Sequence, residues 1–397
     1  MKRKLHDKQV CDEMNEKRQR LKVAFKEAAY IDHCTDDQIL KLVYELEKMR
    51  ESSQAMPLKF RIILSKLPIQ VKNDYLNMSS SEVIQPKIFK LIQSALDIPI
   101  GKIHLSTDSK KIPDIMHTID KQFYGQFMIK ARIISYMISP KATPPLLISG
   151  PPGVGKTTMV RDVIRNITDR PVCEIRLGGA SDQSYLKGSH FVYEGSNLGL
   201  ILNSIISSKC MNPIFFFDEV DKISSTPKGQ EIIATLMEII DSSQNMKFVD
   251  NYLQFPVDIS ESTFIFACND PNQINPILMN RMSLVQMNDY TIDEKCNILN
   301  TYTIPKIMKT LNISPEIQFE KDALRIIVEN ESSSGMRKSI HCVQEILSTI
   351  ELSEAVNDCE CKNTLMLPPL TDGKISSKLV RQIISPPIKM NLSTMYM

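Results

Sequence analysis

The chain has 397 residues, of which 42% are hydrophobic and 24% are charged, so it can bury a substantial core and divide into two or three domains. Its 48 basic and 46 acidic side chains give a formal net charge of only +2, so there is no reason to expect strong sequence-independent binding to nucleic acid. No run approaches the ~18 apolar residues of a membrane-spanning helix, so we expect no membrane partner.

The start of the chain and its cysteines bear on location. The basic residues Lys2, Arg3 and Lys4 lead into polar residues rather than into the apolar run of a secretory signal. The nine cysteines are odd in number and scattered, which is typical of reduced thiols. The pair Cys359 and Cys361 has no second half, so we predict surface thiols there and not a zinc site, which needs four ligands. We expect a reducing, cytoplasmic location, with a nuclear one left open.

The first 100 residues have a helical pattern. Over about 13–50, apolar residues at 39, 43, 46 and 49 fall on one face and charged residues on the other. Prolines at 57, 68, 86 and 99 indicate helix boundaries, because proline lacks an amide donor and restricts the residue before it. We therefore predict a helical N-terminal region over 1–100, which ends near Gly101.

After this boundary the pattern changes. Short apolar runs occur at Leu146–Ser149, Ile214–Phe217 and Thr263–Ala267, and helical segments separate them. Such runs are typical of buried parallel strands joined by crossover helices. The sequence therefore predicts an α/β domain over 101–289, with a parallel sheet and flanking helices. A small all-helical domain with a C-terminal tail is predicted over 290–397.

A phosphate-binding loop follows the first apolar run. Residues 150–157 fit the pattern G-x-x-x-x-G-K-[ST] between a predicted strand and a helical segment, the two contexts that this motif requires. Its glycines let backbone N–H groups turn towards phosphate oxygens, Lys156 neutralises the β- and γ-phosphates, and Thr157 can bind Mg²⁺. The residues predicted to bind the nucleotide are Gly150, Pro151, Pro152, Gly153, Val154, Gly155, Lys156, Thr157 and Thr158.

Acidic and amide side chains follow the other two runs. Asp218 and Glu219 come directly after 214–217, at the edge of the sheet to which the phosphate loop also opens. We predict that Asp218 holds Mg²⁺ through water and that Glu219 activates the attacking water as a general base. The amide of Asn269 is predicted to orient the same water. In the alternative interpretation, the acidic pair caps a helix and Asn269 only forms a turn.

The order of these motifs resembles that of AAA+ ATPases, and the residues between them are similar to the ATPase part of Lon-type proteases. The resemblance covers roughly residues 90–385. The runs that carry it are Ile98–Lys102, Phe123–Gly125, Gly178–Asp182, Tyr193–Gly195, Asp218–Lys222, Gln244–Asn245, Phe248, Asp250–Leu253, Asp258–Ser260, Asn280–Met282 and Gly335–Arg337. The resemblance implies ATP and Mg²⁺ as cofactors, a P-loop AAA+ sheet, and a helical lid domain after it.

The resemblance also implies roles for three further residues. Arg281 would be the arginine finger that reaches the γ-phosphate of a neighbouring subunit, and Arg337 would be the sensor that couples nucleotide state to the lid. A surface ion pair is the alternative for each arginine. Tyr193, in the segment 188–199, would grip a translocated polypeptide. These roles imply a homo-oligomeric ring, with a hexamer as the expected state.

The sequence departs from the family's pattern at several positions. Glu194 follows Tyr193 where the family has an aliphatic residue, and a carboxylate there would weaken an apolar grip on an unfolded chain. Asn280 precedes Arg281 where the family usually has Asp. The sequence ends about a dozen residues after the lid-like segment 376–385. We therefore expect no intrinsic peptidase, and a separate peptidase is a possible partner.

The sequence favours one function and leaves two alternatives. The favoured function is an AAA+ ATPase that hydrolyses ATP to remodel or unfold polypeptide substrates, supported by Tyr193 and the Lon-like runs. The first alternative is a nucleic-acid-associated replication or packaging factor, against which the near-neutral charge counts. The second is a slow, nucleotide-gated scaffold, to which Glu194 gives some weight.

Overall fold

The computed structural model describes part of the chain: residues 35, 37–41, 44, 57–80, 84–104, 112–138, 143–311, 313, 317–330, 335–357 and 373–384. Most of the predicted helix over 13–50 lies outside these residues, as do the basic start of the chain, Cys359 and Cys361. Among the residues that the structure describes, no helix is long and apolar enough to cross a membrane.

The chain divides into two compact units, each assembled from segments that are distant in sequence. The first unit comprises Met1–His104, Ser181–Pro213 and Ala234–Ser262. The second comprises Leu105–Ala180, Ile214–Ile233 and Thr263–Met397. The linear domain boundaries at 100/101 and 289/290 therefore stay predictions.

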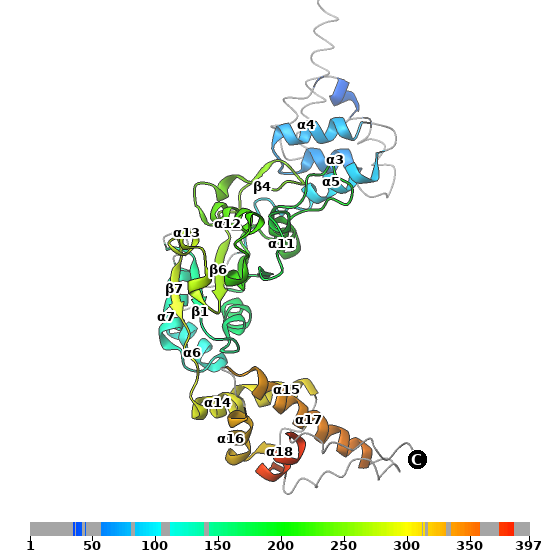
Figure 1. Cartoon of the computed structure of the whole chain (residues 1–397). Coiled ribbons are helices and arrows are strands. Elements are labelled where there is room, and N and C mark those ends of the chain that lie inside the picture. The colour runs from blue at the N-terminus through cyan, green and yellow to red at the C-terminus, as the bar shows by residue number, and fades with distance from the viewer. Residues whose placement is uncertain are drawn as a thin grey trace, which may run out of the picture. The chain divides into compact units, whose positions relative to one another are not determined.

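The predicted parallel sheet forms the centre of the second unit, and it has five strands (Figure 1). Its spatial order is β2-β3-β6-β1-β7, and every neighbouring pair is parallel. The strands are β1 (Leu146–Ser149), β2 (Val172–Arg176), β3 (Ile214–Asp218), β6 (Thr263–Cys268) and β7 (Ser283–Gln286). The three predicted strands occupy the middle of the sheet, because only central strands are apolar along their whole length.

The register of the central strands brings three chain segments to one edge. Ser149 of β1 pairs with Cys268 of β6, and Phe217 of β3 pairs with Phe266 of β6. The Phe217 and Phe266 rings stack with their centroids 4.9 Å apart, which helps to fix this register. The phosphate loop, the acidic pair and Asn269 therefore leave the sheet at neighbouring positions along its carboxyl edge.

Helices flank this sheet. The helix after the phosphate loop contains α8 (Lys156–Thr158), a π-helical turn (Met159–Ile164) and α9 (Arg165–Thr168), and it buries Met159 and Val163 completely. Helix α7 (Phe127–Ile138) lies beside β7. The remaining elements around the sheet are α6 (Ile112–Gln122), two 3-10 turns (Val220–Lys222 and Pro271–Gln273), the first part of α12 (Pro227–Ile240) and α13 (Pro276–Met279).

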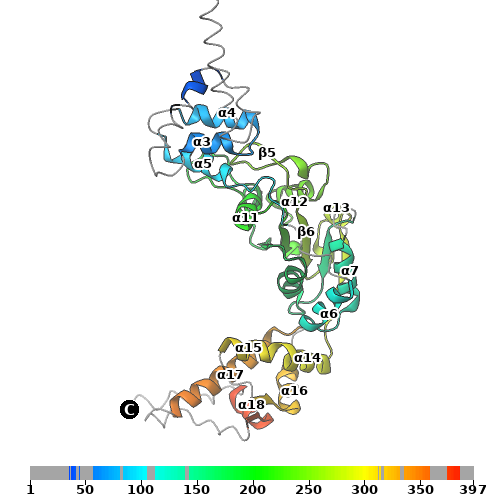
Figure 2. The same cartoon turned by 180° about the vertical axis from the view of Figure 1, so that it is seen from behind.

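The C-terminal part of the second unit is a helical group, which we call the lid (Figure 2). It contains α14 (Ile292–Ile298), a π-helical turn (Leu299–Thr303), α15 (Ile304–Leu311), α16 (Lys321–Glu329), α17 (Arg337–Asn357) and α18 (Ser377–Ile384). A capping box starts α14, with Thr291 and Glu294 bonding each other's backbone N–H groups. One feature was not predicted: β8 (Gln318–Phe319) pairs in parallel with β9 (Lys374–Ile375).

The first unit contains short helices at the positions that the prolines indicated. Pro57 and Pro68 immediately precede α3 (Leu58–Leu64) and α4 (Ile69–Met78), and Pro86 is the first residue of α5. The other elements of this unit are α5 (Pro86–Leu96), α10 (Ser184–Lys187), α11 (Leu200–Ser208), the end of α12, a 3-10 turn (Asn245–Lys247), β4 (Phe248–Val249) and β5 (Pro256–Val257). Helices α3, α4 and α5 gather together in both views (Figures 1 and 2).

A buried carboxylate fixes the base of the 188–199 segment in the first unit. Asp250 is fully buried, and its two oxygens accept the backbone N–H groups of Gly199 at 2.9 Å and Tyr252 at 2.8 Å. Next to it, Asn251 donates to the carbonyls of Lys187 and Gly188. Burial raises the pKa of Asp250 to about 6. The loop that carries Tyr193 therefore starts and ends on a well-defined backbone.

The raised pKa of Asp250 predicts how this unit responds to pH. A carboxyl whose pKa rises from 3.8 to about 6 on folding favours the folded state below pH 4, and this contribution is lost as the pH rises through 6. The free energy of unfolding of the wild type, minus that of Asp250→Asn, should fall by about 2 kcal/mol between pH 4 and pH 7. Urea denaturation of both proteins at several pH values measures this difference. A difference that does not change with pH would contradict the prediction.

Candidate active site

The carboxyl edge of the sheet opens into a cleft with a volume of about 1800 Å³. All of its lining residues belong to the second unit. The predicted site residues that line it are Pro152, Gly153, Val154, Gly155, Lys156, Thr157, Thr158, Asp218, Glu219, Asn269 and Arg337. Gly150 and Pro151 lie just beneath, where their carbonyls contact Lys156. Arg281 and Tyr193 are not among the lining residues.

The phosphate loop needs glycine for two different reasons. Gly153 and Gly155 have φ values of 83° and 98°, in the left-handed region that other residues rarely adopt. At Gly155, a Cβ atom would also lie 2.9 Å from Cε2 of Phe123, so the absence of a side chain lets this ring pack against the loop. The sequence motif predicts the conformation, but not the aromatic neighbour.

Lys156 is buried, and its ammonium is saturated with hydrogen bonds. Its Nζ donates to the Gly150 carbonyl at 2.6 Å, the Pro151 carbonyl at 3.0 Å and Oδ1 of Asn269 at 2.8 Å. Three acceptors match the three protons of an ammonium group. Burial lowers the pKa of Lys156, and the charge of Asp218 opposes that effect. Lys156 is thus held against the phosphate loop by two carbonyls. It also donates a hydrogen bond to Asn269, a predicted catalytic residue.

Thr157 and Asp218 form a cluster of oxygen atoms beside the lysine. The Thr157 hydroxyl donates to Oδ2 of Asp218 at 3.1 Å, and Oδ1 of Asp218 accepts the Glu219 backbone N–H at 2.9 Å. A hydroxyl and a carboxylate are the hard oxygen ligands that suit Mg²⁺, which keeps several waters when it binds. The donor set therefore fits the predicted metal.

Glu219 has an unusual backbone conformation, and its carboxylate lies against Gly178, in the turn after β2. Its φ and ψ of 60° and 40° lie in the left-handed region, where a non-glycine residue is uncommon and strained. Its carboxylate occupies the space in front of Gly178, so that a Cβ atom at Gly178 would overlap Oε2 of Glu219. The next residue, Gly179, has no such neighbour within 4 Å among the residues that the structure describes. The sequence resemblance included both glycines but gave no reason for them.

The lid contacts the phosphate loop through backbone atoms. The Met336 N–H donates to the Gly153 carbonyl at 3.1 Å. Gly335 has a φ of 95°, and a Cβ atom there would overlap the Pro152 carbonyl. Arg337, which follows Met336, starts α17 in the wall of the cleft, where its charge lowers the pKa of Lys156. The phosphate loop and the lid are therefore in direct contact within the second unit.

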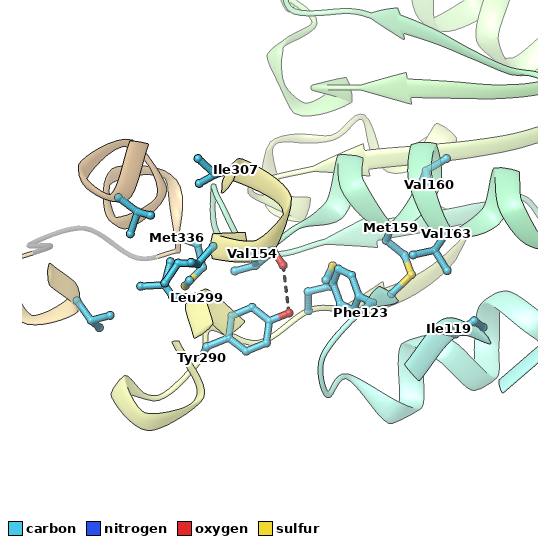
Figure 3. Close-up of a cluster of buried hydrophobic side chains, with 14 of the residues drawn as sticks. Ile119, Phe123, Val154, Met159, Val160, Val163, Tyr290, Leu299, Ile307 and Met336 are labelled. Atoms are coloured by element: carbon cyan, nitrogen blue, oxygen red, sulfur yellow. Dashed lines mark hydrogen bonds between the residues drawn. The ribbon is translucent and has the colours of Figure 1, made fainter. Parts of the chain in front are cut away.

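Aromatic residues line the side of the cleft next to the phosphate loop. The Tyr290 hydroxyl donates to the Val154 carbonyl at 3.3 Å, and Phe123 lies nearby (Figure 3). Tyr124 and Tyr302 meet edge to face with their centroids 6.5 Å apart. Sequence reasoning missed this wall, because its members come from three separate segments. It is suited to an aromatic ring such as a nucleobase.

Two predicted residues lie elsewhere in their units. Arg281 is exposed in the turn between α13 and β7. Tyr193 is 69% exposed and its neighbour Val192 is 64% exposed. Helix α5 contacts the loop that carries Val192 and Tyr193. Lys87 donates to the Val192 carbonyl and Lys90 donates to the Asn197 side chain, both at 2.7 Å. The sequence did not predict these two hydrogen bonds between α5 and the loop.

Comparison with known proteins gives two findings. Residues 146–290 match the model of the ATPase family associated with various cellular activities (AAA). The chain is 34% identical to a Lon protease of Finegoldia magna over 254 residues, which are 62% of this chain and 32% of that protein. It is 30% identical to a Lon protease of Mycoplasma genitalium over 308 residues, which are 76% of this chain and 38% of that protein.

These findings confirm the predicted resemblance to AAA ATPases and to Lon proteases. The chain spans about a third of the length of the curated relatives that it matches. Among solved structures, a mutant of Thermotoga maritima RuvB gives a TM-score of 0.43 at 14% identity, over 65% of this chain and 68% of that chain. That likeness is too low to support an argument.

The two adjacent glycines provide a matched pair of variants. In Gly178→Ala the new methyl group should push the Glu219 carboxylate aside, at little cost in stability because the end of a flexible side chain can move. We expect ATP hydrolysis to fall by about 10- to 100-fold, because Glu219, the predicted general base, would lose its alignment. Gly179→Ala, with no neighbour within 4 Å, should keep the wild-type rate. Steady-state ATPase rates and melting temperatures check both, and equal losses would contradict the assignment.

Proposed function

We propose that this chain, which carries an AAA ATPase domain over residues 146–290, is a Mg²⁺-dependent ATPase that uses hydrolysis to remodel or unfold polypeptides. One observation carries the proposal: Lys156 donates to Asn269, Thr157 donates to Asp218, and all four side chains line a single cleft. The same cleft offers an aromatic wall for a base and backbone N–H groups for phosphates.

Binding of ATP would use the groups that the cleft already holds in place. Lys156 would exchange its carbonyl and amide acceptors for phosphate oxygens, which are stronger acceptors because they are charged. Thr157 and Asp218 would hold Mg²⁺, which neutralises phosphate charge as the phosphoryl group is transferred. The aromatic wall of Phe123, Tyr124 and Tyr302 would take the base.

Hydrolysis would depend on two side chains that follow β3 and β6. Glu219 would accept the proton of the attacking water as general base. Asn269 would orient that water through its amide, which is free to do so once Lys156 turns to the phosphates. Arg337 would add positive charge from the lid side of the cleft and so report nucleotide state to the lid.

A second copy of the chain would complete the site. Arg281 is exposed and is not among the residues that line its own cleft, which supports a role for it at a neighbour's nucleotide. A contact in which one face meets a different face of the next copy forms a ring when its rotation closes, and we propose a closed hexamer. The added arginine charge at the phosphoryl group can accelerate transfer by ~10³-fold or more.

A polypeptide is the proposed substrate of the motor. Tyr193 and Val192 present apolar surface to solvent from a loop whose base is fixed by Asp250 and Asn251. Glu194, also exposed, favours the second candidate, a slow nucleotide-gated scaffold, because its charge opposes an apolar grip. The proposed location is cytoplasmic, and a separate peptidase is a candidate partner.

Substrate stimulation separates these functions. Unfolded, casein-like protein should raise the ATPase rate of the wild type, and Tyr193→Ala should lose this stimulation while keeping its basal rate. Tyr44→Ala removes a tyrosine of similar exposure, 67%, and should respond as the wild type does. Lys156→Ala should show no activity in any condition. Stimulation only by single-stranded DNA would refute the polypeptide assignment, and a slow rate without stimulation would favour the scaffold.

The intersubunit role of Arg281 predicts complementation. Arg281→Ala and Glu219→Gln should each be inactive alone, but mixing the two subunits should restore part of the ATPase rate. In a mixed ring, some subunits with an intact Glu219 receive an intact arginine from the neighbour. Mixing Glu219→Gln with Lys156→Ala is the control, and it should stay inactive because every subunit has a defective cleft of its own. No recovery at any ratio would argue against an arginine acting between subunits.

A further inference from the structure

Asp221 connects the turn after β3 to the turn after β6. It lies in the 3-10 turn Val220–Lys222, and its side chain is fully buried. Its Oδ2 atom accepts the backbone N–H of Asn269 at 3.2 Å and that of Asp270 at 3.3 Å. The backbone of Asn269 is therefore held by a carboxylate from the turn after the neighbouring strand β3.

The buried carboxylate of Asp221 costs free energy of folding, which indicates that it is present for function and not for stability. Its second oxygen, Oδ1, is buried and has no hydrogen-bond partner among the described residues. The Lys222 ammonium is 3.7 Å from Oδ2, but that lysine side chain is 47% exposed, so solvent weakens the pair. Burying a carboxylate with one oxygen unbonded is costly. In return, the negative charge of Asp221 makes stronger hydrogen bonds to the N–H groups of Asn269 and Asp270 than a neutral acceptor would make.

Asn269 is thus held at two points that respond differently to nucleotide. Its side chain is bonded by Lys156, and ATP binding would remove that bond because the lysine turns to the phosphates. Its backbone is bonded by Asp221, which does not line the cleft and would keep its contact whether or not nucleotide is bound. During hydrolysis the backbone contact with Asp221 would therefore remain.

We propose that Asp221 is a positioning residue for ATP hydrolysis: it fixes the backbone of Asn269 so that the amide meets the attacking water after Lys156 has left. This inference rests on the proposed ATPase function and on the role of Asn269 in it. Because Asp221 does not touch the nucleotide, its loss should slow turnover without weakening binding. A misplacement of about 1 Å at a reacting group costs ~10²-fold in rate.

Kinetics of four variants of the full-length chain test this role: Asp221→Ala, Asp221→Asn, Asn269→Ala and the double variant Asp221→Ala/Asn269→Ala. We expect Asp221→Ala to lower kcat by about 10²-fold with KM for ATP unchanged. Asp221→Asn should recover part of the rate, because its carbonyl oxygen can still accept both N–H groups. The double variant should be no slower than Asn269→Ala alone, because Asp221 acts through Asn269.

Asp258→Ala is the matched control. The Asp258 side chain also accepts a backbone N–H, that of Ser260 at 2.9 Å, but it is exposed and belongs to the first unit. It should keep the wild-type rate. If Asp221→Ala does not fold, the same cycle is run with Asp221→Asn. Effects that multiply in the double variant, or a rise in KM that accounts for the loss, would overturn the role of Asp221. A wild type without ATPase activity would instead refute the proposed function.

Discussion

The active-site cleft depends on the parallel register of β3, β6 and β1. Side chains from three distant segments meet only because these strands end side by side, with Ser149 opposite Cys268 and Phe217 opposite Phe266. A shift of one residue in either pairing would turn the buried side chains of a strand to its other face. The fully buried rings of Phe215, Phe216 and Phe217 oppose such a shift, because every face of β3 is covered.

The charges in the cleft balance one another around Lys156. Burial alone disfavours its ammonium form, whereas the carboxylates of Asp218 and Asp221 favour it and the Arg337 guanidinium opposes them. The lysine can stay charged in a buried position because two acidic residues and three hydrogen-bond acceptors surround it. A triphosphate would add negative charge to a site that already contains lysine and arginine, which the phosphate loop and the lid supply separately.

Much of this arrangement could be predicted from sequence because each predicted piece is local. The phosphate loop is contiguous, and Asp218, Glu219 and Asn269 are each adjacent to an apolar strand. Strands β2 and β7 escaped prediction because, at the edges of the sheet, they mix buried with exposed residues. The pairing of β8 with β9 joins two-residue strands more than fifty residues apart, and no local pattern signals it. The roles of Arg281, Arg337 and Tyr193 stay predictions.

The contact between lid and phosphate loop limits how the sequences of such proteins can vary. Gly335 and Gly153 face each other so closely that a Cβ atom at Gly335 would overlap the Pro152 carbonyl, and one at Gly153 would lie 3.0 Å from the Met336 nitrogen. A side chain at Gly335 would clash while the lid keeps this contact, and one at Gly153 would be crowded and would need a φ of 83° that other residues rarely adopt. The two glycines should therefore persist or disappear together among homologues, and an alanine at one of them, in a protein whose lid stays in place, would contradict this expectation.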